Sequence, residues 1–529
     1  MALQLNQELQ NKYPHLEISV LKYSDAMKDN DSKRIDSEFF KKEYLEKLER
    51  LKAISTRLKN LMVSGYYGIL PKSDDYIESG LSLIRGKDIR ETSLNHNNLI
   101  KVPFDYWQER YQIHKNDILF LVKGATIGYS DGVLLITEEP NEKMIFNGSV
   151  FKLRVKDINP YFLYSYMMTS YFTMQKLREV ANNGIEYNSL PTIKNFLIPL
   201  SPLEFQQQIE QMVRESHACL EQSKDLYRQA EVLLYEELGL NPHNPLDFIE
   251  QNLSGSLKTI MRHSNLYRHS DPEQSEGEES PSPNENQDSS PTAQNDENTV
   301  QHNATKYAHL NISVRPLSQS LNATGRLDSE YYQQKYDEIE RVIKNYRGGY
   351  VKIGDCFNQN KTTGNFILSK YNYIEIGDIN IGTATAGYHL IPTNELPANA
   401  KIFLCNGDLL VSKVRPNRGA VAIVNVDESN FIASGAFTVL QENGKIKKEV
   451  LMILLRTTLY KEWLLKFNVG TSYPVIKDED ILNLIIPKIA QQTQTQIAEK
   501  IKQSFTLRQK ASELLQAAKQ TVETAIEKG

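Results

Sequence analysis

The stretch Tyr13-Pro-His-Leu-Glu-Ile-Ser-Val20 returns later in the chain as Tyr307-Ala-His-Leu-Asn-Ile-Ser-Val314, with six of the eight positions identical. A second stretch, Arg34-Ile-Asp-Ser-Glu-Phe-Phe40, returns as Arg326-Leu-Asp-Ser-Glu-Tyr-Tyr332. Repeated sequence is the signature of repeated structure. The chain is therefore predicted to contain two copies of one fold, related by approximate two-fold symmetry.

Shorter motifs follow in the same order through both copies. Asp117-Ile-Leu119 matches Asp408-Leu-Leu410, Gly184 and Tyr187 match Gly470 and Tyr473, Asn195-Phe-Leu-Ile-Pro199 matches Asn483-Leu-Ile-Ile-Pro487, and Gln206 matches Gln494. The offset between partners stays between 286 and 294 residues. Chance does not produce such an order, so the repeat covers most of the chain.

The repeat divides the 529 residues into five predicted segments. Two globular domains span 13–200 and 307–488, two helical regions span 203–250 and 489–529, and a linker spans 254–305. The core of the linker is rich in Ser, Pro, Asn, Gln, Asp and Glu, so it cannot bury enough apolar surface to offset its ordering entropy. We predict a disordered linker, which is either a flexible tether or a tolerated insertion.

The net charge of −5 is concentrated in this linker. Residues 271–300 hold nine Asp and Glu and no Lys or Arg, so the remainder of the chain carries a formal charge of +4. A mildly basic remainder is compatible with contact to nucleic acid but does not by itself indicate it.

Each copy begins with an amphipathic helix, continues through short apolar runs separated by Gly, Asn and Asp, and closes with a long helix. This order predicts an α+β protein. The closing helices carry apolar residues at alternating steps of three and four, which is a heptad seam. The seam residues are Ile209, Val213, Leu220, Tyr227 and Leu234 in the first helix and Ile501, Leu515 and Val522 in the second, with Arg508 interrupting it. We predict that the helices pair as an antiparallel coiled coil; two amphipathic helices on separate cores are the alternative.

Composition also limits the compartment. No apolar run approaches the length that spans a bilayer, and the N-terminus is polar without a signal-peptide core. Cys219, Cys356 and Cys405 are far apart and odd in number, which favours a reducing compartment. We therefore expect a cytoplasmic protein with no membrane partner.

The sequence lacks the common motifs of catalytic and cofactor-binding sites. The sequence has no G-x-x-x-x-G-K-[ST], no G-x-G-x-x-G after a strand, no H-E-x-x-H and no Cys-x-x-Cys. The Asn/Asp-Pro-Pro-aromatic signature of DNA amino-methyltransferases is missing too. The chain is predicted to be non-catalytic, with no metal site and no cofactor of its own.

Basic and polar residues in loops are the remaining candidates for chemistry. They are Arg85, Lys87, Arg90, Lys123 and Thr126 in the first copy and Lys413, Arg415, Asn417 and Arg418 in the second. Arg and Lys can contact phosphates or guanine edges, and Asn can pair with adenine. For any one of these residues alone, a solvated surface position is the commoner role.

The doubled order of motifs resembles the specificity subunits of type I restriction-modification enzymes. The resemblance rests on Arg-[Ile/Leu]-Asp-x-Glu-aromatic-aromatic, an Asp-[Ile/Leu]-Leu strand, a Gly-x-x-Tyr loop, an Ile-Pro pair and a Gln-x-x-Ile that opens the long helix. It covers nearly the whole chain outside the linker. The second copy has Ala490 where the first has Pro202, and the long acidic linker departs from the family pattern.

The resemblance implies that each globular part is a target-recognition domain reading one half of a bipartite double-stranded DNA site. The loops carrying Tyr187 and Tyr473 are then candidate DNA contacts. The paired helices would set the spacer and dock two methyltransferase subunits. S-adenosylmethionine would bind those subunits, and ATP and Mg²⁺ would serve a separate restriction-translocase subunit in a bacterial cytoplasm.

The sequence is also compatible with other functions. The chain could belong to a related fused restriction system or a phage-defence methylation system. It could also be an enzyme with an unrecognised site, or a coiled-coil scaffold without DNA contact. Salt-sensitive DNA affinity separates the scaffold from a DNA reader, because counterion release accompanies phosphate contact.

Overall fold

The computed structural model describes residues 2–28, 30, 33–89, 99–124, 127–128, 131–180, 187–252, 317–318, 325–425, 430–470 and 472–528. The chain forms two compact units, the first being Met1–Ser223 with Phe505–Gly529 and the second Lys224–Ser504. The second copy in the sequence runs to the end of the chain, but its last residues, Phe505–Gly529, belong to the first compact unit. The predicted linker, 254–305, and the repeat stretch 307–314 lie outside the described residues.

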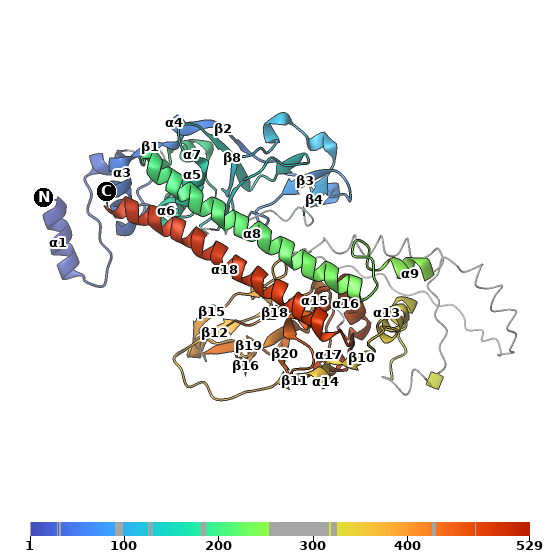
Figure 1. The fold of residues 1–529 in the computed structure, drawn as a ribbon. Coiled ribbons are helices and arrows are strands. Elements are labelled where there is room, and N and C mark those ends of the chain that lie inside the picture. The colour runs from blue at the N-terminus through green and yellow to red at the C-terminus, as the bar shows by residue number, and fades with distance from the viewer. Residues whose placement is uncertain are drawn as a thin grey trace, which may run out of the picture. The chain divides into compact units, whose positions relative to one another are not determined.

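The first unit is built from short helices and strands (Figure 1). Its helices are α1 (Ala2–Lys12), α2 (Tyr23–Met27), α3 (Lys42–Ile54), α4 (Leu58–Leu61), α5 (Pro160–Met167), α6 (Ser170–Arg178) and α7 (Leu190–Asn195). Its strands are β1 (Ser55–Arg57), β2 (Met62–Tyr67), β3 (Leu81–Ile84), β4 (Ile100–Val102), β5 (Ile118–Leu121), β6 (Val133–Leu135), β7 (Met144–Phe146), β8 (Val150–Val155) and β9 (Leu197–Pro199).

The second unit has the same kinds of element. Its helices are α9 (Asp247–Asn252), α13 (Gln334–Lys344), α14 (Ile353–Cys356), α15 (Lys448–Arg456), α16 (Thr458–Leu464) and α17 (Asp478–Asn483). Its strands are β10 (Tyr350–Lys352), β11 (Phe357–Asn360), β12 (Lys370–Ile374), β13 (Ile379–Asn380), β14 (Thr385–Ala386), β15 (His389–Pro392), β16 (Ala400–Phe403), β17 (Leu409–Ser412), β18 (Val421–Ile423), β19 (Phe431–Ser434), β20 (Phe437–Glu442) and β21 (Ile485–Pro487).

The strand order repeats between the units. The first unit has a sheet in the order β2-β8-β5-β6 and the second has β11-β20-β17-β18, all with antiparallel neighbours. A second sheet contains the parallel pair β3–β7 in one unit and β12–β19 in the other. The sheets differ at one edge, because β16 pairs with β19 and the first unit has no strand at that edge of β7 among its described residues.

The Asp of the Asp-[Ile/Leu]-Leu motif opens the central strand of each unit. Asp117 is fully buried and accepts hydrogen bonds from the His114 backbone, at 2.9 Å, and from Arg154. Asp408 is equally buried and accepts from the Cys405 backbone, also at 2.9 Å. Each carboxylate thus stabilises the turn that feeds a strand of four buried residues.

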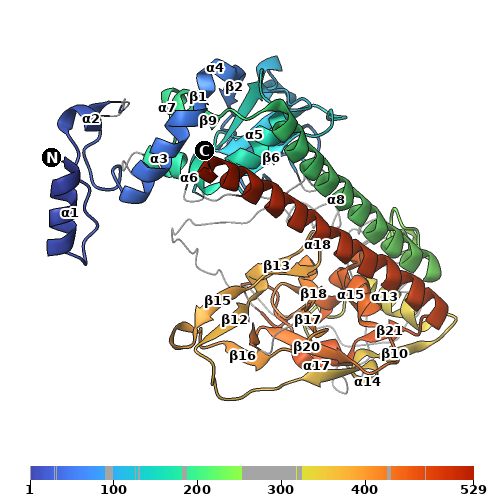
Figure 2. The ribbon, with the colours of Figure 1, turned by 60° about the vertical axis from the view of Figure 1, so that its left-hand side comes forward.

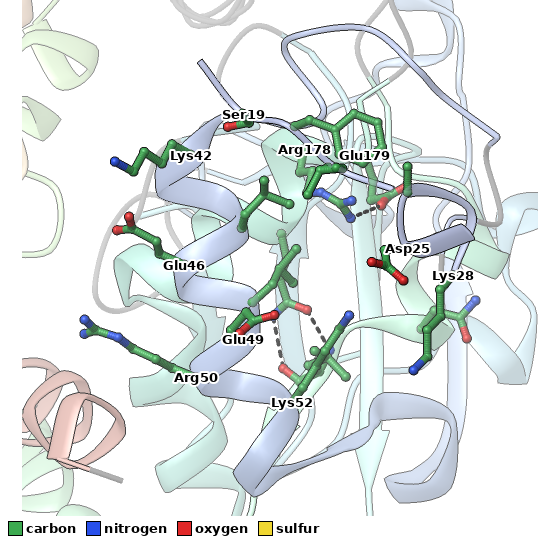
Figure 3. Close-up of a pocket in the computed structure, with 18 of the residues that line it drawn as sticks. Ser19, Asp25, Lys28, Lys42, Glu46, Glu49, Arg50, Lys52, Arg178 and Glu179 are labelled. Carbon is green, nitrogen blue, oxygen red and sulfur yellow. Dashed lines mark hydrogen bonds and ion pairs between the residues drawn. The ribbon is translucent and has the colours of Figure 1, made fainter. Parts of the chain in front are cut away.

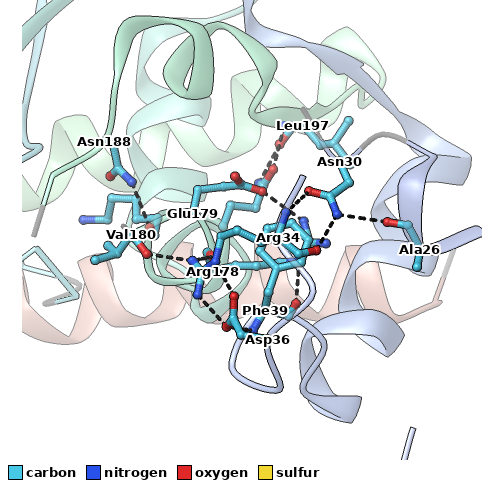
Figure 4. Close-up of polar contacts among 12 residues, drawn as sticks. Ala26, Asn30, Arg34, Asp36, Phe39, Arg178, Glu179, Val180, Asn188 and Leu197 are labelled. Atoms are coloured by element: carbon cyan, nitrogen blue, oxygen red, sulfur yellow. Dashed lines mark hydrogen bonds and ion pairs between the residues drawn. The ribbon is translucent and has the colours of Figure 1, made fainter. Parts of the chain in front are cut away.

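The opening Arg-x-Asp motif forms an ion pair in both units, and Figure 4 shows the pair of the first unit. The Arg34 guanidinium makes a bidentate contact with the Asp36 carboxylate, with both N–O distances 2.7 Å. It also donates to the Val180 carbonyl at 2.6 Å. In the second unit the Arg326 guanidinium donates to both carboxylate oxygens of Asp328, at 2.7 and 2.8 Å. The motif ties the start of each domain to its later helices, so its repetition reflects packing.

The long helices are α8 (Leu203–Glu237) and α18 (Gln491–Lys528). A glutamine that the two copies share holds the start of each helix: the Gln206 side chain accepts from the Asn159 backbone at 2.8 Å, and the Gln494 side chain accepts from the Lys447 backbone at 2.9 Å. The equivalent contact in both units explains the repeated Gln-x-x-Ile motif.

Both long helices contribute to each unit. In the first, the start of α8 and the end of α18 run side by side (Figures 1 and 2), with Ile209 and Val213 in one core cluster with Val522. Of the predicted seam residues, the buried ones are Ile209, Val213, Leu234, Ile501 and Val522, and the half-buried ones are Leu220, Tyr227 and Leu515. Arg508, which interrupts the seam, donates to Ser223 Oγ at 2.7 Å.

The predicted α+β class is confirmed, and it includes the long C-terminal helix. The five predicted segment boundaries stay a prediction. Among the described residues, no helix is both long enough and apolar enough to cross a bilayer.

Candidate nucleic-acid interface

A tight turn between two strands organises the loops of the first unit. We call residues 147–149, which join β7 to β8, the first hub turn. The Val122 backbone donates to Ser149 O at 3.0 Å, and the Asn147 backbone donates to Ile84 O at 2.9 Å. A Cβ added at Gly86 would lie 3.1 Å from Ser149 Oγ. The loops that carry Lys87 and Lys123 therefore meet at this turn.

The second unit has the matching turn at residues 434–436, between β19 and β20, which we call the second hub turn. The Lys413 backbone donates to Ala436 O at 2.9 Å, as Val122 does to Ser149. The Gly435 backbone donates to Asn399 O at 2.7 Å. The loop after β17, which holds the predicted basic cluster, thus leaves the sheet at the second hub turn.

The Gly-x-x-Tyr loops reach the ends of the same central strands. Lys123 forms an isolated antiparallel bridge with Tyr187, and Val414 forms the matching bridge with Val475. Tyr187 is 49% exposed and Tyr473 is 47% exposed. Two loops that are distant in sequence therefore present an aromatic ring next to a basic strand end in each unit.

Arg415 has the most defined geometry of the candidates. Its backbone adopts a left-handed conformation, with φ of 49°, and its amide donates to Pro474 O at 2.7 Å. The guanidinium lies 5.5 Å from the centre of the Tyr473 ring, within cation–π range. The arginine and the exposed ring therefore form one platform at the surface.

The other second-unit candidates have different surroundings. Lys413 pairs with Asp478 at 3.0 Å. Burial alone would raise the pKa of Asp478, but hydrogen bonds from Thr438 and Lys413 hold that pKa below its usual range. Asn417 has a buried Oδ1 with no hydrogen-bond partner among the described residues, whereas Arg418 is exposed. Lys413 thus serves packing at least in part, while Arg418 faces solvent.

In the first unit, Arg85 and Lys87 lie in the turn after β3. The Arg85 guanidinium contacts Asp88 at 3.0 Å and its backbone donates to the same carboxylate at 2.8 Å, so its side chain is held against its own turn. Lys87 is exposed. Arg90 and Thr126 lie outside the described residues.

Sequence reasoning missed the hub turns. A signal was present, because Asn147-Gly-Ser149 and Ser434-Gly-Ala436 are offset by 287 residues, like the other repeated motifs. Their short, polar sequence gave no reason to single them out. Their importance lies in the hydrogen bonds they receive from other loops.

Among the described residues, neither a metal-binding cluster nor the groove beside α3 provides a second candidate interface. No group of three or more His, Cys, Asp or Glu within the described part of the chain is placed to hold a metal ion. A groove of about 1480 Å³ lies between the N-terminal segment and α3 (Figure 3), and its lining along α3 carries both signs of charge, with Lys42, Glu46, Glu49 and Arg50. Mixed charge does not provide the one-signed surface that a phosphate backbone attracts.

The family model and the curated relatives that match this chain carry the same kind of name. Residues 68–229 and 345–520 match the family "Type I restriction modification DNA specificity domain". The chain is 31% identical over 157 residues to the type I restriction enzyme EcoBI specificity subunit of Escherichia coli, covering 29% of this chain and 31% of that protein. It is 28% identical over 141 residues to the HindI specificity subunit of Haemophilus influenzae, covering 26% and 28%. Each matched stretch spans about a third of the curated relative or less.

Two solved structures are also matched, both at low sequence identity. The S subunit of a type I restriction-modification system from M. genitalium is 13% identical, with a TM-score of 0.37, covering 90% of this chain and 95% of that one. The HsdS subunit from Thermoanaerobacter tengcongensis is also 13% identical, with a TM-score of 0.26, covering 89% and 96%.

Proposed function

Because the chain belongs to the family of type I restriction modification DNA specificity domains, we propose that it is the DNA-reading specificity subunit of such a system. Each unit reads one half of a bipartite site in double-stranded DNA. The observation that carries this proposal is the doubling: two family matches coincide with two sheets of the same strand order and two hub turns. A pair of similar readers suits a site with two halves.

The hub turns gather the groups that would face DNA. The backbone of Lys123 bridges that of Tyr187, whose ring is exposed, and the Arg415 guanidinium lies over the exposed ring of Tyr473. Each unit thus brings a basic residue and an exposed ring together near its hub turn. Arginine and lysine can contact phosphates or guanine edges. The chain itself does no chemistry in this proposal.

The long helices would act as a ruler between the two half-sites. Contacts inside each unit support antiparallel pairing: Ser216 Oγ donates to Ala511 O at 2.7 Å in the first, and Lys500 Nζ donates to Gln229 at 2.6 Å in the second. From Ser216 to Gln229 the residue numbers increase along α8, whereas those of the contacted residues in α18 decrease from Ala511 to Lys500, as antiparallel helices require. Such a coiled coil fixes a length, and the same helices offer a docking surface for two methyltransferase subunits.

The partners supply the reaction. S-adenosylmethionine binds the methyltransferase subunits, and ATP and Mg²⁺ serve a restriction-translocase subunit, all within the bacterial cytoplasm. The test is to map methylated adenines in the host genome with and without this gene. The proposal requires a two-part sequence with a fixed gap that disappears when the gene is deleted. Unchanged methylation after deletion, or methyl transfer by the purified chain alone, would contradict it.

The ruler has a separate test. Inserting one heptad after Leu220 and another after Arg508 preserves the seam and lengthens it by about 10 Å, or roughly three base pairs. The gap in the mapped site should grow by that amount while both half-sites stay unchanged. An unchanged gap in an active variant would assign the spacing to another element.

A further inference from the structure

The glycine at the centre of each hub turn is covered by one side chain. A Cβ added at Gly148 would lie 2.7 Å from Leu70 Cδ2 in the first unit. A Cβ added at Gly435 would lie 3.2 Å from Lys401 Cδ in the second. The two glycines are equivalent in the repeat, but the side chains over them have opposite chemistry.

Different segments deliver these two side chains. Leu70 belongs to the loop between β2 and β3, and its neighbour Ile69 bridges Asn147 in parallel. Lys401 belongs to β16, whose Ala400 pairs with Ser434 in antiparallel register. At this edge of the sheet, the first unit therefore has a loop beside β7, whereas the second unit has strand β16 beside β19.

Both side chains stand on rigid backbone. In the first unit, the Ile69 amide donates to Phe146 O at 2.9 Å, and a Cβ at Gly68 would lie 2.0 Å from that same oxygen, so the loop is pressed onto the turn. In the second unit, the Asn399 side chain donates to Ser434 Oγ at 3.1 Å and accepts from Tyr373 at 2.9 Å. A backbone that is already ordered does not have to lose conformational entropy when a side chain on it contacts a ligand.

Both side chains also face water. Leu70 is 76% exposed, and Lys401 is exposed as well. A single exposed leucine is ordinary on a protein surface. Here it stands on the turn that organises the loops of Lys87 and Lys123, and the equivalent place in the second unit holds a cation.

From this equivalence we propose that the side chain on each hub glycine determines one base of its half-site. Leu70 contacts the 5-methyl group of a thymine, the apolar feature of the major groove. Lys401 donates to O6 and N7 of a guanine. This inference rests on the proposed function and names specificity-determining residues for it.

The first test removes the thymine methyl group. Duplexes carrying the mapped site are prepared with each thymine of the first half-site replaced singly by deoxyuridine, and binding is measured with the chain assembled with its host's methyltransferase subunits. One replacement should weaken binding roughly fourfold, which corresponds to about 0.8 kcal/mol for one buried methylene-sized group. The Leu70→Ala complex should bind the thymine and deoxyuridine duplexes equally.

Val63→Ala is the matched control. Val63 is 57% exposed at the start of β2, where that strand pairs with the far end of β8 from the hub turn. This variant should keep the discrimination of the native chain. If no thymine shows the effect, or if Leu70→Ala keeps it, the assignment of Leu70 is overturned.

The second test concerns Lys401→Met. This variant should lose its preference at one guanine-cytosine pair of the second half-site, by roughly 5- to 150-fold, and leave the first half-site unchanged. Equal weakening on all duplexes would make Lys401 a phosphate contact and overturn its role as a base reader. If the native complex does not distinguish its mapped site from a scrambled duplex, the proposed function itself fails, which is a different outcome.

Discussion

The loop that leaves the central strand has a left-handed residue at the same place in both units. In the first unit this residue is Gly124, with φ of 99°, and in the second it is Arg415, with φ of 49°. Glycine adopts this conformation freely, whereas another residue loses roughly 1–2 kcal/mol in it. The second unit thus tolerates a local cost to hold a guanidinium over Tyr473, which is typical of functional positions.

At two other pairs of equivalent positions the backbone is alike and the side chain differs. The turn after β3 opens with Arg85 in the first unit, and the matching turn after β12 opens with Glu375, although each backbone amide donates to an Asp three residues later at 2.8 Å. Inside the domains, Lys176 of α6 stands where α16 has Leu464. The repeat preserved hydrogen bonds that hold the fold and exchanged the side chains around them.

The largest effect is expected from exchanging a whole reading domain. Replacing residues 13–200 by the equivalent part of a relative with another target should change the first half-site entirely and leave the second intact. Each mismatched base pair costs about 1–3 kcal/mol, so affinity for the old site should fall by roughly 1000-fold or more. Methylome mapping gives the readout, and exchange of residues 307–488 is the reciprocal control. Change in both half-sites would show that the units do not read independently.

Lys176→Leu should stabilise the protein, since it makes the first unit like the second. Lys176 is fully buried, its Nζ lacks a hydrogen-bond partner among the described residues, and burial lowers its pKa from 10.5 to about 8. Charging this amine in the folded state at pH 7 therefore costs about 3 kcal/mol, which the variant should recover.

The pH dependence distinguishes this cause from better packing. The unfolded lysine keeps its proton up to about pH 10.5 and the folded one only up to about pH 8, so native stability rises with pH between those values. Urea unfolding should show the advantage of Lys176→Leu at pH 7 and its decline above pH 8. Leu464→Lys should destabilise the second unit in the same pH range. An advantage independent of pH would assign the gain to packing.

Arg415→Gly should separate reading from folding. Glycine relieves the left-handed conformation, so the unfolding midpoint should not fall, while loss of the guanidinium should weaken specific binding by roughly 1–3 kcal/mol. Binding to duplexes with each base pair changed will show whether one position or every position is affected. Gly124→Arg provides the converse, with added strain and no ring platform. If the Arg415→Gly variant binds DNA with the affinity of the native chain, Arg415 does not contact DNA.

The smallest effect is expected from Glu375→Arg, which gives the second unit the charge of the first. An added phosphate contact should steepen the slope of log affinity against log salt by about 0.9 and act alike on all sequences. Glu375→Gln, which removes charge without adding a cation, is the control. A change confined to one base pair would place this turn in base reading instead.

Much of the fold was predictable because the repeat shares backbone roles. Asp117 and Asp408, Arg34 and Arg326, and Gln206 and Gln494 each make equivalent hydrogen bonds, so their identity and spacing persisted. The Gly-x-x-Tyr match singled out Tyr473, and the structure places Arg415 over its ring.

The side chains on the hub glycines could not be found in the same way. Leu70 and Lys401 come from segments that do not align, one from a loop and the other from an additional strand. Their equivalence exists only in space. Nor could spacing show that Arg85 is held by Asp88 or Lys413 by Asp478, because those pairings depend on turns and on a distant helix.

The end of α18 completes the hydrophobic core of the first unit, where Ala518, Val522 and Ile526 are buried in the cluster that contains Ile209 and Val213. A ribosome makes residues 224–504 between those two sets. At about 5–20 residues per second, this interval lasts roughly 15 to 60 s. During that time the nascent first unit holds part of its core open to water, so the domain made first is among the last to finish folding.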